Sequence, residues 1–165
     1  MGWDVHIKSE IQVLDGANPI AFQLAKCEKT IDRRYFWFVE EHIFNQSESI
    51  LSQLEKMLNI PISWLGEIMH SDELVENLND ENNRDACFLL IEPSLQKLIE
   101  LENCLLKEID VTGKFTFASD MSEVNKKYYP DYVQHGEFLT DIQSLLNTLD
   151  CYQKNGAKKF VMWYG

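Results

Sequence analysis

The chain has 165 residues, a length that suits one globular domain with a single core, and we expect residues 1–165 to form that domain. Hydrophobic residues make up 45% of the chain, with only seven Gly and four Pro, so the composition excludes a largely disordered protein. The formal net charge of −12 disfavours binding of nucleic acid or anionic membrane through a broad basic face, and it favours a basic protein partner.

The four cysteines are far apart in the sequence, and each lies in or beside an apolar segment. This spacing predicts free, buried thiols without a zinc site, as in a reducing compartment. No stretch approaches the roughly 18 apolar residues of a membrane-spanning helix, and the N-terminus lacks the features of a signal peptide. We therefore expect a cytoplasmic protein that needs neither a disulfide nor a metal. The cysteines are Cys27, Cys87, Cys104 and Cys151.

The N-terminal region predicts a strand followed by a short helix. Residues 3–8 alternate apolar and polar side chains, which is typical of a strand with one buried face. Residues 11–16 either extend this strand or turn. Asn18 and Pro19 are a good N-cap and first residue of a helix that ends near Lys29, although strand is the alternative for its first residues.

Residues 33–58 carry the longest helical pattern, and Asp32 is a candidate N-cap. Polar residues at 45–49 offer a point where this helix could break. The segment 35–39 is apolar around its whole circumference, which predicts central burial as a helix, with strand as the competing interpretation. The second half is clearly amphipathic and ends before Pro61.

The central segments are shorter. Residues 61–69 predict a short helix, and Ser71 is a candidate cap for a helix that continues to Leu78. Residues 79–85 form the most polar run and predict an exposed loop. Residues 87–91 are wholly apolar, which indicates either a buried strand or the lead-in to the next helix.

A long helix is predicted from Pro93 to about Ile109 by apolar residues at a 3.6-residue period. Residues 114–118 are a candidate strand. Ser119 is a candidate cap for a short helix that ends before Pro130.

The last part of the chain predicts a helix from Asp131 to about Tyr152, stopped at Gly156, and then an aromatic strand at 158–164. Because a strand at the chain end needs a neighbour, we expect it to pair with the N-terminal strand. The predicted fold class is α+β: a helix-dominated single domain with a small, antiparallel sheet that includes both terminal strands. The apolar stripe of the helix consists of Phe138, Ile142, Leu145, Leu146, Leu149 and Tyr152.

Catalytic motifs are not recognisable in the sequence. It contains no glycine-rich phosphate loop and no G-x-S-x-G elbow, and it predicts no cofactor and no catalytic residue. Glu67 and His70 have the E-x-x-H spacing of di-iron bundles, but a second such motif is missing, so we predict no metal site. Trp37 and Trp64 are predicted to be core residues because each lies in an apolar segment.

The run from Glu67 to Glu92 is acidic and contains a single basic residue, Arg84. It indicates either a surface that attracts a basic partner or simply a solvated face. Trp3 and Trp163 lie on the two terminal strands, and one of them could face solvent and serve as an aromatic anchor. The candidate partner-binding residues are Asp72, Glu73, Glu76, Asp80, Glu81, Asp85 and Trp163.

With its acidic charge, its many aromatics and its lack of a catalytic motif, the chain resembles, as a class, the immunity proteins of bacterial polymorphic-toxin and contact-dependent growth inhibition systems. The resemblance implies a non-catalytic protein that neutralises a cognate toxin domain, basic and of nuclease type, by one-to-one binding.

Two alternatives remain open. One is a small enzyme or ligand-binding domain whose site is assembled from distant residues and includes His6, His42 or His135. It would require a cleft that holds a His and a carboxylate with perturbed pKa values. The other is a structural subunit with an exposed apolar patch around Trp163 and Tyr164.

Overall fold

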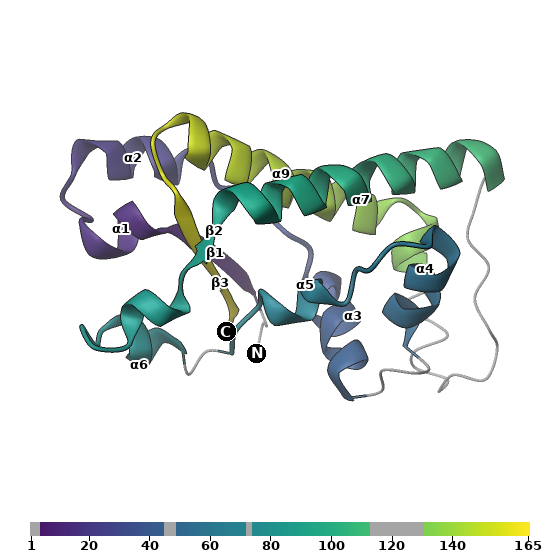
Figure 1. The fold of residues 1–165 in the computed structure, drawn as a ribbon, viewed down its shortest axis with the longest axis horizontal. Helices are drawn as coiled ribbons and strands as arrows, with labels where there is room; N and C mark the ends of the chain where they lie inside the picture. Colours follow the sequence, from purple (N-terminus) through teal and green to yellow (C-terminus); the bar gives the residue numbers. More distant parts are fainter. Residues whose placement is uncertain (1–3, 45–48, 72–73, 113–130) are drawn as a thin grey trace.

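The structure, a computed structural model, describes residues 4–44, 49–71, 74–112 and 131–165. Helices dominate it, and one small sheet joins the two ends of the chain (Figure 1). Both pairings in this sheet are antiparallel, and the order is β1-β3-β2. The predicted α+β class and the pairing of the terminal strands are confirmed. The strands are β1 (Val5–Ser9), β2 (Leu89–Leu90) and β3 (Lys159–Tyr164).

The terminal strands pair because each buries alternate side chains on the same face. Ile7 lies opposite Met162, and both side chains are buried in the main core. Beyond the strands, Asp4 and Gly165 exchange two backbone hydrogen bonds of 3.0 Å. The other face of β3 carries Val161 and Trp163, which belong to a separate small cluster.

Residues 10–14 form helix α1 (Glu10–Leu14), where the sequence predicted a longer strand or a turn. The cause is a capping box: Ser9 Oγ accepts from the Gln12 backbone N–H at 3.2 Å, and Gln12 Oε1 accepts from the Ser9 N–H at 2.9 Å. Helix α2 (Pro19–Ala25) has the predicted N-cap and proline but ends earlier than predicted. Phe22 is 68% exposed on it.

The long helical region consists of α3 (Arg33–Phe44) and α4 (Ile50–Leu58). Asp32 caps α3 as predicted, since its Oδ1 accepts from the Arg34 backbone N–H at 2.8 Å. The aromatic segment 35–39 is helical, so the alternative of a strand was wrong. Its side chains are buried except for Trp37, which is 42% exposed. The prediction that Trp37 is a core residue was therefore wrong, because a single helix cannot bury its whole circumference here.

Three short helices follow α4 along the chain and precede β2. They are α5 (Trp64–Glu67), α6 (Leu74–Leu78) and the 3₁₀ helix η1 (Arg84–Cys87). The expected loop at 79–85 is therefore partly a 3₁₀ turn. Trp64 is buried, as predicted.

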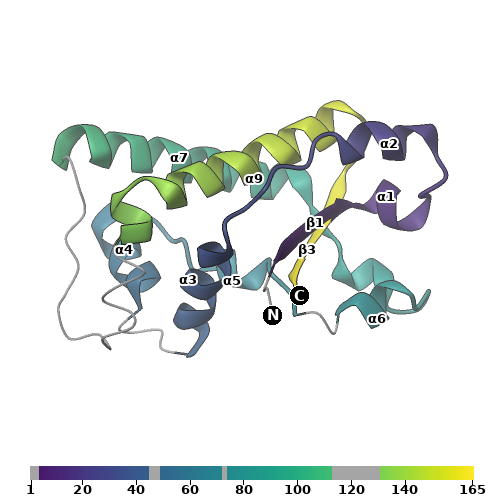
Figure 2. The same ribbon diagram turned by 180° about the vertical axis from the view of Figure 1, so that it is seen from behind.

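The apolar segment before Pro93 is both strand and helix start, because β2 leads directly into α7 (Ile91–Thr112). Helix α9 (Glu137–Lys154) packs along α7, and the two cross above the sheet (Figures 1 and 2). The predicted start at Asp131 was too early. Residues 131–134 form a separate helical turn, and Gly136 at φ +81° separates it from α9. The predicted strand at 114–118 and the helix after Ser119 lie outside the described residues.

A disulfide between Cys27 and Cys151 overturns the prediction of four free thiols. It joins the segment after α2 to the last turn of α9, with a Cα–Cα distance of 5.6 Å. Only the tertiary structure brings these two residues together, since they are 124 residues apart. Cys87 and Cys104 remain free thiols. Within the described ranges, no helix has the length and apolar character to cross a bilayer.

Candidate functional site

A small apolar cluster on the second face of the sheet attaches α6 and η1 to β3. Cys87, Phe88 and Val161 are its buried members. Leu78 at the end of α6 and Trp163 pack against them as partly buried residues. The cluster therefore places the acidic segment that α6 and η1 carry beside the C-terminal end of β3.

Trp163 lies at the solvent-facing edge of this cluster, between two histidines. His6 faces it from β1 and stacks on the indole, with ring centroids 5.3 Å apart and an interplanar angle of 27°. On the other side, the His70 backbone bridges β3: its N–H donates to Met162 O at 2.9 Å, and its O accepts from Tyr164 N–H at 3.1 Å. Burial lowers the pKa of His70. His6 is exposed and Trp163 is half-buried, so this aromatic pair is accessible.

The acidic side chains of α6, η1 and the turn between them divide into exposed and structural groups. Glu76, Glu81 and Asp85 are exposed, and none of them forms an ion pair with a described residue. Asp80 is half-buried and stabilises the turn after α6, because its carboxylate accepts from the Asn82 N–H at 3.0 Å and the Asn83 amide at 2.7 Å. Of the predicted site residues, Asp72 and Glu73 lie outside the described residues.

Trp163 and the three exposed acids are thus brought to one side of the sheet, which we call the acidic arm surface. It comprises Glu76, Glu81, Asp85, Trp163 and His6. A concentration of unpaired carboxylates at an exposed surface raises the local density of cationic partners and speeds their encounter. The sequence did not predict a role for His6 here, because its cross-strand position opposite Trp163 depends on the register of β1 and β3.

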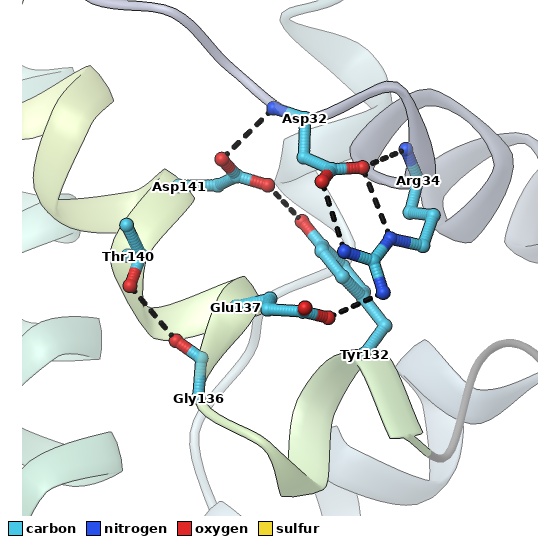
Figure 3. A network of polar contacts seen from close by, with 7 residues as sticks. All are labelled: Asp32, Arg34, Tyr132, Gly136, Glu137, Thr140 and Asp141. Atoms are coloured by element: carbon cyan, nitrogen blue, oxygen red, sulfur yellow. Dashed lines mark hydrogen bonds and ion pairs between the residues drawn. The ribbon is translucent and has the colours of Figure 1, made fainter.

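A buried polar network is the second unusual arrangement of side chains (Figure 3). Asp141 of α9 is only 4% exposed, and its carboxylate bridges two segments. Oδ1 accepts from the Asp32 backbone N–H at 3.0 Å, and Oδ2 accepts from the Tyr132 hydroxyl at 2.6 Å. Burial raises the pKa of Asp141 to about 6. Burial also raises the pKa of Tyr132.

Arg34 extends the network toward the surface. Its guanidinium donates to both oxygens of Asp32, at 3.0 and 2.9 Å, and pairs with Glu137 on α9 (Figure 3). The Arg34 hydrogen bond lowers the pKa of Asp32. The guanidinium also lies over the Tyr132 ring, 5.5 Å from its centroid. The network therefore holds the start of α3, the turn before α9 and α9 itself together.

The network holds a carboxylate with a raised pKa, and its described contacts are the hydrogen bonds and ion pairs given above. Asp141 is enclosed by structural contacts. No histidine lines the surface grooves beside Trp64, Lys56 and Phe22, which described residues form. Within the same residues, no group of three or more His, Cys, Asp or Glu could hold a metal ion. His135 is exposed near Asp131, and the side chain of His42 lies outside the described residues.

Comparisons of the chain with protein-family models, with curated proteins and with solved structures found no match.

Proposed function

We propose that this chain is a non-catalytic, acidic binding protein of the immunity type, which neutralises a cognate basic toxin domain by one-to-one binding. The observation that carries the proposal is the acidic arm surface. An accessible Trp163–His6 stack lies beside an acidic segment whose exposed carboxylates form no ion pair with a described residue.

The division of labour in such a complex follows from the chemistry of the two groups. Aromatic side chains in the centre of an interface supply most of the affinity when the partner buries them. Glu76, Glu81 and Asp85 would pair with Lys and Arg of the toxin, which in a nuclease hold substrate phosphates. At physiological ionic strength screening acts over about 8 Å, so charge would contribute mainly to speed and selectivity.

The cytoplasm is the location that fits a nuclease-type target, because intracellular nucleic acid would be the substrate to protect. The cysteines do not favour this location, since Cys27 and Cys151 are joined. Reducing compartments keep most thiols reduced, so the disulfide would favour an oxidising one. The proposed cytoplasmic location of this protein therefore depends only on the proposed nuclease-type target.

The test is the binding of this protein to the C-terminal domain of the polypeptide encoded immediately upstream, at low and at physiological salt. We expect tight, salt-sensitive, one-to-one association. Glu76→Lys with Glu81→Lys should slow association by about tenfold or more at low salt, because the steering charge is reversed. Asp80 is left unchanged in this variant because its carboxylate caps a turn. Trp163→Ala should instead raise the dissociation rate.

A matched control reverses Glu102 of α7 and Asp131 of the turn before α9, neither of which belongs to the acidic arm surface. Both double variants raise the net charge from −12 to −8. If the two variants slow association equally, net charge and not the arm is responsible. Absence of binding at micromolar concentration would remove the immunity proposal altogether.

A further inference from the structure

A groove between α5 and α7 has an aromatic wall that already carries a cation. Its volume is about 280 Å³, and Trp64 of α5 forms part of its lining. The Lys97 ammonium of α7 lies 5.5 Å from the centroid of the indole. The ring is held in place because its Nε1–H donates to Pro61 O at 3.0 Å. The indole therefore presents a fixed face to whatever occupies the groove.

Two carboxylates flank this face. Glu67 of α5 and Glu100 of α7 both line the groove and are exposed. Neither forms an ion pair with a described residue, and Lys97 does not pair with either of them. An aromatic face beside two unpaired carboxylates is the environment that a guanidinium prefers, since it can stack on the ring and bind a carboxylate through two N–H groups.

The groove has room for one inserted side chain. Sites for whole small molecules usually enclose roughly 300–1,000 Å³. The groove lies just below that range at about 280 Å³, and it is partly open, which suits one inserted side chain. Lys97 sits on the edge of the site as an internal substitute for that side chain, and its flexible stem allows it to move aside.

We propose that this groove is a subsite for an arginine side chain of the basic partner, which displaces Lys97 from the Trp64 ring. This inference rests on the proposed function, because the partner would supply the arginine. One residue of the groove lies close in sequence to a residue that borders the acidic arm surface. Glu67 is three residues from His70, which pairs with β3 beside Trp163, and three residues span at most about 11 Å. One partner can therefore reach both.

The test uses the protein alone and titrates it with N-acetyl-arginine amide, while the indole N–H signal of Trp64 is followed by NMR. Trp64→Phe assigns that signal among the four tryptophans. We expect a saturable shift with the arginine probe and none with N-acetyl-citrulline amide, which has nearly the same shape but no charge. Lys97→Gln should bind the probe about twofold to fivefold more tightly, because the competing cation is gone.

Glu67→Gln with Glu100→Gln should abolish the shift, whereas Glu102→Gln, on the same helix but outside the groove, should leave it unchanged. Equal shifts with the citrulline probe, or unchanged affinity in Lys97→Gln, would overturn the inference. Because no partner protein is present in this experiment, a negative result would overturn the arginine subsite without contradicting the proposed function of the acidic arm surface. Conversely, arginine binding here would persist even if the upstream domain did not bind.

Discussion

Asp141 is the residue whose chemistry departs most from its ordinary behaviour. The residue is only 4% exposed, and its carboxylate accepts hydrogen bonds from two donors, the Asp32 N–H and the Tyr132 hydroxyl. These donors favour the charged form, but burial outweighs them and raises the pKa to about 6. Sequence patterns gave no sign of this, because Asp141 lies on the predicted helix among other polar positions and its partners are distant in the chain.

The raised pKa predicts how stability depends on pH. A carboxyl group whose pKa is higher in the folded state stabilises the fold below its unfolded pKa, and this contribution is lost as pH rises through the folded value. The pKa of Asp141 rises from 3.8 in the unfolded chain to about 6 in the folded protein. This shift corresponds to a loss of about 2 kcal/mol in the free energy of unfolding between pH 4 and pH 7. Urea denaturation across that range should measure it.

The matched variant is Asp141→Asn, which keeps an acceptor for the Asp32 N–H and can donate to the Tyr132 hydroxyl. Its stability should vary less between pH 4 and pH 7 than that of the natural protein. Asp32 has a lowered pKa and acts in the opposite sense, since its stabilisation is lost as pH falls. Identical pH profiles for the two proteins would show that Asp141 does not titrate in this range.

Among the elements, α9 is the one on which the rest depend. It packs along α7, carries Asp141 and ends at the disulfide. Its stripe was predicted from spacing alone, and all six residues pack into the main core, with only Leu146 partly exposed. The helix therefore combines the clearest sequence pattern with the most extensive burial.

Leu145→Ala should lower the free energy of unfolding by about 2 to 5 kcal/mol, because the side chain is fully buried and its removal leaves a cavity. The matched control is Leu106→Ala on α7, the same substitution at a side chain that is 40% exposed, which should cost less than about 1 kcal/mol. Denaturant titration of both variants measures the difference. Equal losses would mean that α9 is not central to the core.

For the whole molecule, the Cys27–Cys151 disulfide is the longest covalent constraint among the described residues. It closes a loop with a sequence separation of 124, which restricts the unfolded chain far more than the folded one. On the chain-entropy model such a loop contributes up to about 5 kcal/mol, with measured values more often 2 to 4.

Reduction with dithiothreitol should therefore lower the denaturation midpoint of the natural protein. It should have no effect on a Cys27→Ala, Cys151→Ala variant, which should resemble the reduced protein. Cys104→Ala removes a free thiol and should remain sensitive to reduction. Midpoints that do not change on reduction would indicate that the two sulfurs are not bonded in solution or that the bond does not stabilise the fold.

Local patterns in the sequence predicted most of the helices, several of their caps and the two terminal strands. Asn18, Asp32 and Gly156 act as predicted because caps and left-handed turns depend on a few neighbouring residues. The α+β class followed because alternation and a 3.6-residue period are also local signals.

Only the tertiary structure decided which distant side chains meet. It joined Cys27 to Cys151, exposed Trp37 and enclosed Asp141. In the same way it placed His6 on Trp163 and Lys97 on Trp64. These contacts depend on strand register and helix packing, which no short pattern encodes, and the proposed functions depend on them.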